Sequence, residues 1–352
     1  MKRQMLPPTF VPGFHDESAV HKMRYNKLGE TDMVVSVLGL GAAAYSNIYA
    51  SFSEDEAIIT IREAIKKGVN YIDGGYWYGQ GRAEEVIGKA LEGIPRKAYY
   101  IASKVGRYEL DRQKMFDFSA ETSRKSIDRS LRSLKLEYLD LIQVHDVEFA
   151  PSLEHVMAAT MPALEEAVRA GKARHVGVTG EPVCVLQQAV ERSPVRVDTV
   201  LSYCRDTLID DTLKQFLPFF QSRGVGVVHA SATAMGLLTN AGPPAWHPAP
   251  DSMKSVCALA SAYCKERGVE LGRLAVHHSL SQRGPAVNVV SMASRELLRA
   301  NLQLVHEGLS AREQAVLQEV RDRFLSKLPQ KHWEGVQLEK HRASLARAAS
   351  SQ

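Results

Sequence analysis

The sequence predicts an α/β protein built as a closed eight-stranded barrel, the (β/α)8 or TIM barrel, with an N-terminal β-hairpin and a C-terminal helical extension. Eight short apolar runs are each followed by a segment whose apolar residues recur at helical spacing. An open doubly wound sheet that binds a dinucleotide would carry G-x-G-x-x-G after its first strand. Residues 39–44 read GLGAAA and lack the third glycine. The strand count and the length of 352 residues therefore favour the barrel.

The elements follow one another in a regular order. Residues 1–22 contain prolines and show no periodicity, so they predict an N-terminal arm. Two short extended runs, 23–28 and 33–38, are joined by residues 29–32 and predict a hairpin. The predicted barrel strands are residues 37–40, 69–73, 99–104, 141–145, 173–178, 197–201, 225–229 and 287–290.

Helical patterns follow these strands. The clearest covers residues 54–67, where Ala57, Ile61 and Ala64 share one face and Gly68 ends the pattern. Further helices are predicted at residues 83–91, 119–134, 153–170 and 310–328.

The chain is expected to form one large domain. Residues 23–328 would make up the barrel, residues 1–22 the arm, and residues 329–352 a C-terminal tail that frays over its last six residues. Two positions remain open for the C-terminal extension, one over the pocket and one on the underside of the barrel.

Composition and charge exclude several classes of function. The 44 basic and 40 acidic residues leave a net charge of +4, which is too small and dispersed to predict binding to nucleic acid or to a membrane surface. No apolar stretch approaches the roughly 18 residues of a membrane span, and the N-terminus lacks the apolar core of a signal peptide. The four cysteines form no C-x-x-C pair and no histidine cluster has zinc spacing, so no metal is predicted. We expect a cytoplasmic protein with reduced thiols.

Polar residues stand where three consecutive predicted strands end. Asp73 ends the second strand, Lys104 the third and His145 the fourth, and Tyr78 follows Asp73 after a short loop. Because neighbouring parallel strands lie about 4.8 Å apart, their C-terminal ends are side by side. The four side chains should therefore converge at the end of the barrel where (β/α)8 enzymes carry out their chemistry.

This group suits the transfer of a proton at a carbon–oxygen centre. Tyr78 is the candidate general acid or base, and the ammonium of Lys104 would favour its phenolate form. Asp73 would hold Lys104 in place, and His145 would orient the substrate oxygen. Such a set fits hydride transfer, in which an alcohol loses a proton to Tyr78 and a hydride to a nicotinamide ring.

Each of these residues also has an ordinary structural explanation. A lysine at a strand end is usually solvated, and an aspartate there usually caps a turn. A single histidine is usually a hydrogen-bonded structural residue, and Tyr78 with Gly79 could simply form a turn. Four such coincidences on three consecutive strands favour the functional interpretation.

The same residues lie in segments that resemble the aldo-keto reductase superfamily. The matching segments occur in collinear order between about residues 23 and 301, and they are 71–79 (YIDGGYWYG), 84–91 (EEVIGKAL), 101–105 (IASKV), 138–145 (YLDLIQVH) and 171–179 (GKARHVGVT). Residues 145–149 (HDVEF), 201–204 (LSYC) and 236–248 resemble the L-galactose dehydrogenase-like group. The resemblance implies oxidation of an aldose such as L-galactose at C1 to the lactone, with NAD as acceptor. It also implies that Asp73, Tyr78, Lys104 and His145 form the catalytic set, with the tyrosine as proton donor.

The resemblance further implies a set of cofactor-binding residues. The loop after the seventh strand would wrap the pyrophosphate, and the helix that begins after the eighth strand would bind an anion at its N-terminus. The implied contacts are Ser231, Ala232, Gly236, Leu237, Ser291, Ser294, Arg295 and Asn301, together with Thr179 after the fifth strand.

Departures from the family pattern bear on the cofactor. Met292 stands where NADP-preferring relatives place a lysine against the 2′-phosphate, so NAD is favoured over NADP, although Arg295 or Arg299 could compensate. Ala230 replaces the aromatic residue that usually stacks on the nicotinamide. Thr179 and Gly180 replace the usual Ser-Asn pair that holds the carboxamide.

The expected partner is a small sugar or carbonyl substrate, and the sequence does not indicate an oligomeric state. Predicted pocket-wall residues are Tyr76, Trp77, Asp146 and Trp246, for which packing in the core is the alternative explanation. Two rival functions are an NADPH-dependent carbonyl reductase of small aldehydes and a nicotinamide-binding regulatory subunit. The complete catalytic set favours an enzyme over the second rival.

Overall fold

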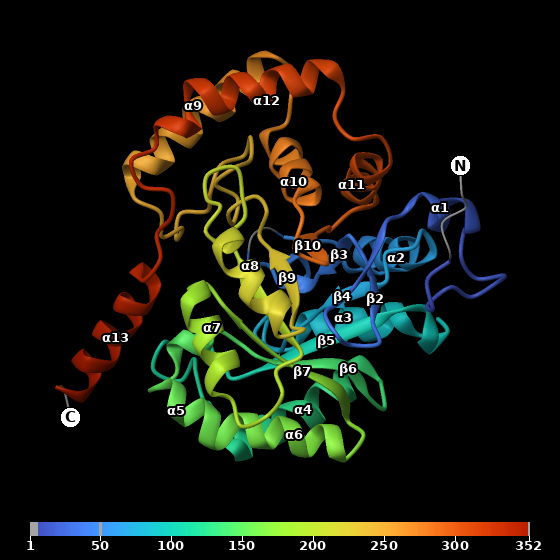
Figure 1. Ribbon diagram of the computed structural model, residues 1–352, viewed down its shortest axis with the longest axis vertical. Helices are drawn as coiled ribbons and strands as arrows, with labels where there is room; N and C mark the ends of the chain where they lie inside the picture. Colours follow the sequence, from blue (N-terminus) through green and yellow to red (C-terminus); the bar gives the residue numbers. More distant parts are fainter. Residues whose placement is uncertain (1–5, 49–50, 351–352) are drawn as a thin grey trace.

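The computed structural model describes residues 6–48 and 51–350 (Figure 1). Within these residues, eight parallel strands close into a barrel in the order β10-β3-β4-β5-β6-β7-β8-β9, which confirms the predicted fold class. The strands are β3 (Leu38–Gly41), β4 (Tyr71–Asp73), β5 (Tyr100–Val105), β6 (Leu139–Val144), β7 (Ala173–Gly180), β8 (Thr199–Tyr203), β9 (Gly226–Ala230) and β10 (Val287–Ser291). Each predicted barrel strand is present.

The predicted hairpin closes the N-terminal end of the barrel. Its strands, β1 (Tyr25–Lys27) and β2 (Val34–Ser36), pair antiparallel. A Cβ atom on Gly29 in the turn would lie 2.3 Å from the backbone nitrogen of Gly226 at the start of β9. Gly29 also has a φ of 58°, so glycine is required at this close approach of two backbones. The hairpin leaves the C-terminal ends of the strands for chemistry.

Helices surround the barrel, as Figure 1 shows. The first, α2, illustrates why they form: Ser53 accepts a hydrogen bond from the Glu56 N–H at its start, its first turn is acidic, and its inward Ile61 and Ala64 are buried. The surrounding helices are α2 (Glu54–Lys66), α3 (Arg82–Leu91), α4 (Ala120–Leu134), α6 (Met161–Arg169), α7 (Val183–Arg192), α8 (Leu213–Ser222), α10 (Leu271–Ser281) and α11 (Arg295–Glu307). The short α5 (Leu153–His155) and a π-helical turn, η4 (Val156–Thr160), lead into α6. Outside this layer, α9 (Asp251–Glu266) and α12 (Ala311–Arg323) lie side by side.

Apolar side chains fill both faces of the barrel wall. One layer packs between the strands and the helices, and a second fills the interior of the barrel. The interior residues alternate along each strand, as the period of two requires, and include Tyr71, Tyr100, Ala102, Leu141, Leu201, Val228, Val287 and Val289. On β5 and β6, Lys104 and Gln143 continue this inner face toward the C-terminal end.

The N-terminal arm contains a helix that the sequence did not predict. Helix α1 (Glu17–Lys22) begins at Asp16, whose carboxylate accepts a hydrogen bond from the Ala19 N–H at 3.1 Å and pairs with Lys67 at 2.7 Å. A helix of six residues is too short to show an apolar period, so pattern analysis of the arm could not detect it.

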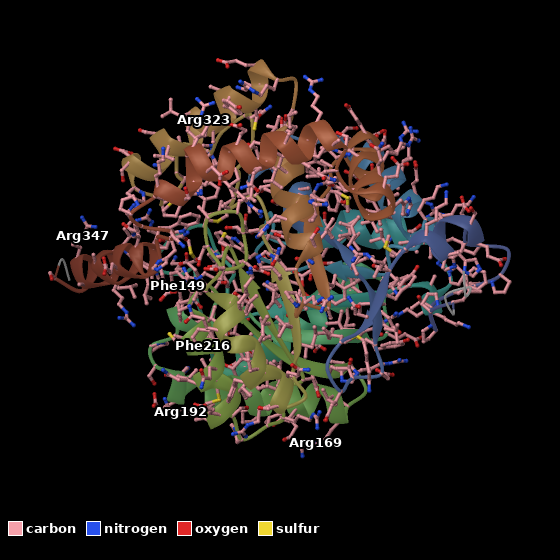
Figure 2. All side chains as sticks on the ribbon, turned by 45° about the horizontal axis from the view of Figure 1, so that its top comes forward. Phe149, Arg169, Arg192, Phe216, Arg323 and Arg347 are labelled. Carbon is pink, nitrogen blue, oxygen red and sulfur yellow. The ribbon has the colours of Figure 1, made fainter. Side chains whose placement is uncertain are left out.

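The C-terminal extension packs at the catalytic end of the barrel. It contains a 3-10 turn, η5 (Leu325–Lys327), and α13 (Val336–Ala349), a helix within the segment 329–352 for which the sequence predicted only a tail. Residues 351–352 of the predicted frayed end lie outside the described residues. Glu334 forms an ion pair of 2.8 Å with Arg205, which follows β8. His341 of α13 lies with its ring 5.6 Å from that of Phe149, which follows β6 and is labelled near this helix in Figure 2. Of the two positions left open by the sequence, the structure shows the one at the mouth of the barrel.

No helix in the described ranges is long and apolar enough to cross a membrane. The cysteines are free thiols. Over the same ranges, histidine, cysteine and acidic side chains do not gather in groups that could hold a metal ion.

Candidate active site

Lys104, near the end of β5, lies at the centre of a buried polar cluster. Its ammonium forms an ion pair with Asp73, the last residue of β4, and donates to the Gly74 carbonyl at 2.7 Å. Gln143 of β6 donates from Nε2 to the second oxygen of Asp73 at 3.1 Å. Sequence reasoning missed Gln143, although a polar residue two positions before His145 shares its face of the strand. The cluster fixes the position of the ammonium.

Tyr78 lies in the loop after β4, and it completes the group of four. Its ring centre is 5.1 Å from Lys104 Nζ and 5.7 Å from that of His145. Burial raises the pKa of Tyr78 above 10, and the ammonium of Lys104 only partly offsets this effect. Tyr78 is therefore a neutral phenol at pH 7, and burial outweighs the influence of Lys104 that the sequence predicted.

Lys104 keeps its charge in this environment. Burial acts to lower its pKa, but the carboxylate of Asp73 and the hydroxyl of Tyr78 outweigh burial and hold the pKa above 10.5. A permanent ammonium beside the phenol can stabilise the phenolate whenever the proton leaves.

His145, which directly follows β6, is a neutral imidazole. Burial, together with the positive charges of Lys104 and Arg107, holds its pKa well below 6.5. Its Nδ1 is buried with no hydrogen-bond partner in the described part of the chain, and its Nε2 lies 3.8 Å from a carboxylate oxygen of Asp146. A neutral ring with one N–H can donate to a substrate oxygen without taking the proton from Tyr78.

Arg107 and Asp146 form a second charged pair beside these residues. Arg107 follows β5, and its Nη1 donates to Asp146 Oδ2 at 2.7 Å. Its guanidinium lies 4.0 Å from the ring centre of Trp77. Asp146 adopts a left-handed φ of 53°, and its N–H donates to the Thr179 hydroxyl at 3.0 Å. Sequence reasoning expected Trp77 and Asp146 here but missed Arg107, because one arginine in a polar loop gives no signal.

The loop after β9 has an unusual backbone. Ser231, Ala234, Met235 and Gly236 all have positive φ values, between 50° and 94°. Turns within the loop are closed by hydrogen bonds such as Ala234 N–H to Ser231 carbonyl at 2.8 Å. Chains that curl in this way form concave surfaces lined by backbone N–H groups, which suit phosphate oxygens. Ala232 and Leu237 are buried supports of this loop.

The loop after β10 lies beside it, because β9 and β10 pair in the barrel. Ser291 is exposed at its start, and the Ser294 hydroxyl caps α11 by accepting from the Leu297 N–H at 3.3 Å. Arg295 forms a bidentate pair with Glu56 of α2, at 3.1 Å from both carboxylate oxygens. Asn301 is buried further along α11.

Residues 37–322 match the model of the Aldo/keto reductase family. The chain belongs to this family. It is 40% identical to L-galactose dehydrogenase from Arabidopsis thaliana over 289 residues, which cover 81% of this chain and 89% of that protein. It is 30% identical to D-arabinose 1-dehydrogenase from Saccharomyces cerevisiae over 288 residues, which cover 77% and 84% respectively. The holo form of an aldo-keto reductase from Bacillus halodurans superposes with a TM-score of 0.68 at 26% identity, covering 85% of this chain and 96% of that one.

The protein is therefore an aldo-keto oxidoreductase, and such enzymes use nicotinamide cofactors. The curled loop after β9 fits the phosphates of a dinucleotide, because its left-handed residues make a concave backbone at the same end of the barrel as Tyr78. At the start of α11, the Arg295 N–H is already bonded to Glu56 at 3.0 Å. The individual contacts assigned to Ser231, Gly236, Ser291 and Ser294 stay predictions.

The remaining predicted residues of this aldo-keto reductase lie in varied surroundings. The ring of Tyr76 is covered by the Arg129 guanidinium at 3.3 Å, so it packs toward the helices. Trp246 is half exposed, with its ring 6.4 Å from that of His247. A Cβ atom on Gly180 would lie 2.6 Å from Glu148 Oε2, so a side chain at this position would require the Glu148 carboxylate to move. The pocket roles of Tyr76 and Trp246 stay predictions.

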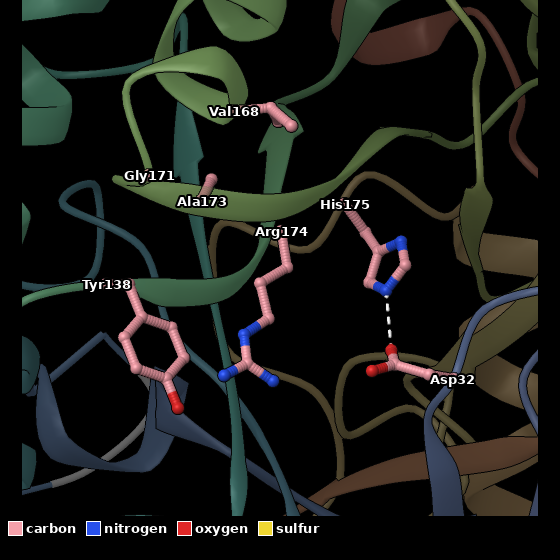
Figure 3. Close-up of a pocket in the computed structure, with 7 residues that line it drawn as sticks. All are labelled: Asp32, Tyr138, Val168, Gly171, Ala173, Arg174 and His175. Carbon is pink, nitrogen blue, oxygen red and sulfur yellow. Dashed lines mark hydrogen bonds and ion pairs between the residues drawn. The ribbon is translucent and has the colours of Figure 1, made fainter.

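A pocket of about 550 Å³ lies at the opposite end of the barrel (Figure 3). It is lined by the starts of β6 and β7 and by Asp32 of the hairpin turn. His175 bonds to Asp32 at 2.8 Å and lies 3.4 Å from Asp198. Because these residues are at the N-terminal ends of the strands, the pocket belongs to the docking of the hairpin and not to the site around Tyr78.

Proposed function

We propose that this aldo-keto reductase is an NAD-dependent aldose 1-dehydrogenase that oxidises a sugar such as L-galactose at C1 to the lactone. The observation that carries the proposal is the meeting of Tyr78, His145 and the ammonium of Lys104 at one end of the barrel. The names of the Arabidopsis and Saccharomyces relatives, which are dehydrogenases of aldoses, support the choice of substrate.

The residues around the phenol of Tyr78 have separate roles in proton transfer. In oxidation, the C1 hydroxyl gives its proton to the oxygen of Tyr78, while the neutral His145 orients the same substrate oxygen. The ammonium of Lys104 stabilises the phenolate that accepts this proton, and Asp73 and Gln143 hold the ammonium in place. In reduction, Tyr78 donates its proton to the carbonyl oxygen. When bound, the nicotinamide dinucleotide supplies the acceptor or donor of the hydride at C1.

Two ion pairs support NAD over NADP. Arg295 is engaged by Glu56 and Arg299 by Glu63, so both arginines near the start of α11 already face carboxylates of α2. A 2′-phosphate in this region would have to displace a carboxylate and would meet its negative charge. Met292 is fully buried and contributes no cationic side chain.

The test of substrate and cofactor is a matrix of initial rates. NAD and NADP are each offered with L-galactose and L-fucose, and NADH and NADPH with a reactive aldehyde. We expect sugar oxidation with NAD to exceed the NADP rate. Turnover of the aldehyde with NADPH and of no sugar would replace this proposal by the carbonyl-reductase alternative. Binding of a dinucleotide without any turnover would favour the regulatory subunit.

Tyr78→Phe tests the assignment of the proton carrier. Removing the hydroxyl should lower turnover by about 10²- to 10⁴-fold, while the dinucleotide dissociation constant stays within a small factor of wild type. Because the pKa of Tyr78 is raised, oxidation by the wild type should also become faster as the pH rises. Tyr263→Phe is the control, since this tyrosine bonds to Glu319 on the outer helices. Wild-type turnover in Tyr78→Phe would remove Tyr78 from the mechanism.

A further inference from the structure

Arg107 and Asp146 form an ion pair that is largely buried, although both residues lie in loops. The side chain of Asp146 is 3% exposed and that of Arg107 is 18% exposed. The guanidinium lies over two aromatic rings, 4.0 Å from the centre of Trp77 and 5.3 Å from that of Phe116. These contacts hold the planar fork in one orientation.

The pair lies next to the reacting groups. Asp146 is adjacent to His145 in sequence, and its Oδ2 is 3.8 Å from His145 Nε2. Both charges act on the phenol: Asp146 raises the pKa of Tyr78 and Arg107 lowers it. A substrate whose oxygen is held by Tyr78 and His145 therefore places its neighbouring carbon atoms close to this pair.

The backbone conformation of Asp146 places its side chain beside His145. A φ of 53° is uncommon for residues other than glycine, and aspartate tolerates it better than most. The Thr179 hydroxyl accepts the Asp146 N–H at 3.0 Å and holds the turn. Strained conformations of this kind are concentrated at ligand-binding and catalytic sites.

The pair retains unused hydrogen-bonding capacity. Arginine has five N–H donors, and the hydrogen bond from Arg107 to Asp146 uses one of them. Arg107 Nε is buried with no hydrogen-bond partner among the residues that the structure describes. Asp146 likewise makes its ion pair through Oδ2, which leaves the lone pairs of Oδ1 as acceptors within the described structure.

The chemistry of the pair selects among ligands. A hydroxyl can donate to the carboxylate and accept from the guanidinium, so a vicinal diol matches both groups. An anionic ligand would gain from Arg107 but would be repelled by Asp146, and the pair as a whole is neutral. A ligand without hydroxyls would displace water from two charged groups and replace none of its hydrogen bonds.

We infer that Arg107 and Asp146 are the specificity-determining residues of this enzyme, and that they select substrates with hydroxyls next to the reacting carbon over simple aldehydes. This inference rests on the proposed function for the identity of the sugar. The selectivity for hydroxyls can be measured on three-carbon aldehydes, without L-galactose or another hexose.

The test compares glyceraldehyde with propanal. The two are three-carbon aldehydes that differ in the hydroxyls beside the carbonyl, and both are reduced with the same dinucleotide. The measured quantity is the ratio of kcat/KM for glyceraldehyde to kcat/KM for propanal. Arg107→Met should lower this ratio by about 10- to 100-fold, the range for loss of a hydrogen bond to a charged group. Arg107→Lys should give an intermediate ratio, because it keeps the charge but not the fork.

Controls separate this role from a merely structural one. Arg112→Met removes an exposed arginine from the same loop and should leave the ratio unchanged. If Arg107→Met is folded by circular dichroism and both aldehydes lose the same factor, the pair only supports the loop and the inference is wrong. If that variant does not fold, an unchanged ratio in Arg107→Lys overturns the inference. If the wild type fails to oxidise L-galactose but the ratio still falls in the Arg107 variants, the proposed function is refuted and the inference about Arg107 and Asp146 stands.

Discussion

Glu181 offers a quantitative test of how burial of a carboxyl group at the mouth of the barrel changes the stability of the fold with pH. It follows β7, is 5% exposed, and its Oε1 has no hydrogen-bond partner in the described chain. The pKa of its carboxyl is raised from 4.5 to about 7. Burial is the largest cause, Arg205 acts to lower the pKa, and the carboxylates of Glu334 and Asp146 add to the rise. The folded protein therefore holds a proton that the unfolded chain releases.

The sign and size of the effect follow from this difference. Below pH 4.5 both states are protonated, so Glu181 contributes no pH-dependent term. As the pH rises from 4.5 to about 7, only the unfolded chain ionises freely, and the folded state loses stability. A shift of this size corresponds to about 3 kcal/mol, at about 1.4 kcal/mol for each pH unit. The penalty is complete above about pH 7.

Glu181→Gln removes the ionisable group and keeps the shape of the neutral side chain. The variant should match wild type near pH 4.5 and be more stable by about 3 kcal/mol at pH 8. For a chain of this length the gain corresponds to about 4 °C in Tm. The assay is thermal unfolding of the cofactor-free protein from pH 5 to pH 8.

An exposed carboxyl provides the matched control. Glu137→Gln, which lies on the surface before β6, should follow the wild-type profile at every pH. A Glu181→Gln protein that is no more stable than wild type at pH 8, or whose advantage does not change with pH, would refute the reasoning about burial.

Three further substitutions have definite expected outcomes. Lys104→Met leaves a buried carboxylate unpaired and should cost about 3–5 kcal/mol in unfolding free energy, measured by urea denaturation, whereas a cost below 1 kcal/mol would mean that the ion pair is dispensable. Gly88→Ala places a Cβ atom 2.3 Å from the Ser133 carbonyl oxygen and should lower the Tm, while an unchanged Tm would show that α3 and α4 can separate at no cost. Burial lowers the pKa of His175, but its hydrogen bonds to Asp198 and to the hairpin turn outweigh burial and raise the pKa above 6.5. The stabilisation is thus present below pH 6.5 and lost as the pH rises through the raised value, so His175→Ala should lower the Tm more at pH 5.5 than at pH 8.5, and equal losses would contradict this.

Much of the barrel could be predicted because its signals are local. Short apolar runs, helices with a period near 3.6 and the glycine in the hairpin turn are each signals that depend on a few neighbouring residues. Asp73, Lys104 and His145 could be placed together because parallel strands bring equivalent ends side by side.

The missed features depend on contacts between distant segments. Arg107 belongs to the site only because Asp146, from another loop, reaches it. The neutral state of Tyr78 follows from burial that no sequence pattern reports. Helix α13 has a weak apolar face, and it is positioned by single contacts such as that of Glu334 with Arg205. These features depend on burial and on charges from distant segments, and the periodicity of a single sequence carries no information on either.

The attachment of residues 333–341 to the barrel mouth has a practical consequence. Glu334 reaches Arg205 and Trp333 packs its ring 4.7 Å from that of His247, so residues remote in sequence help to wall the reaction chamber. Truncating the protein after the last helix of the family match would open that wall. Such a shortened version would be a different catalyst and not a minimal form of the same one.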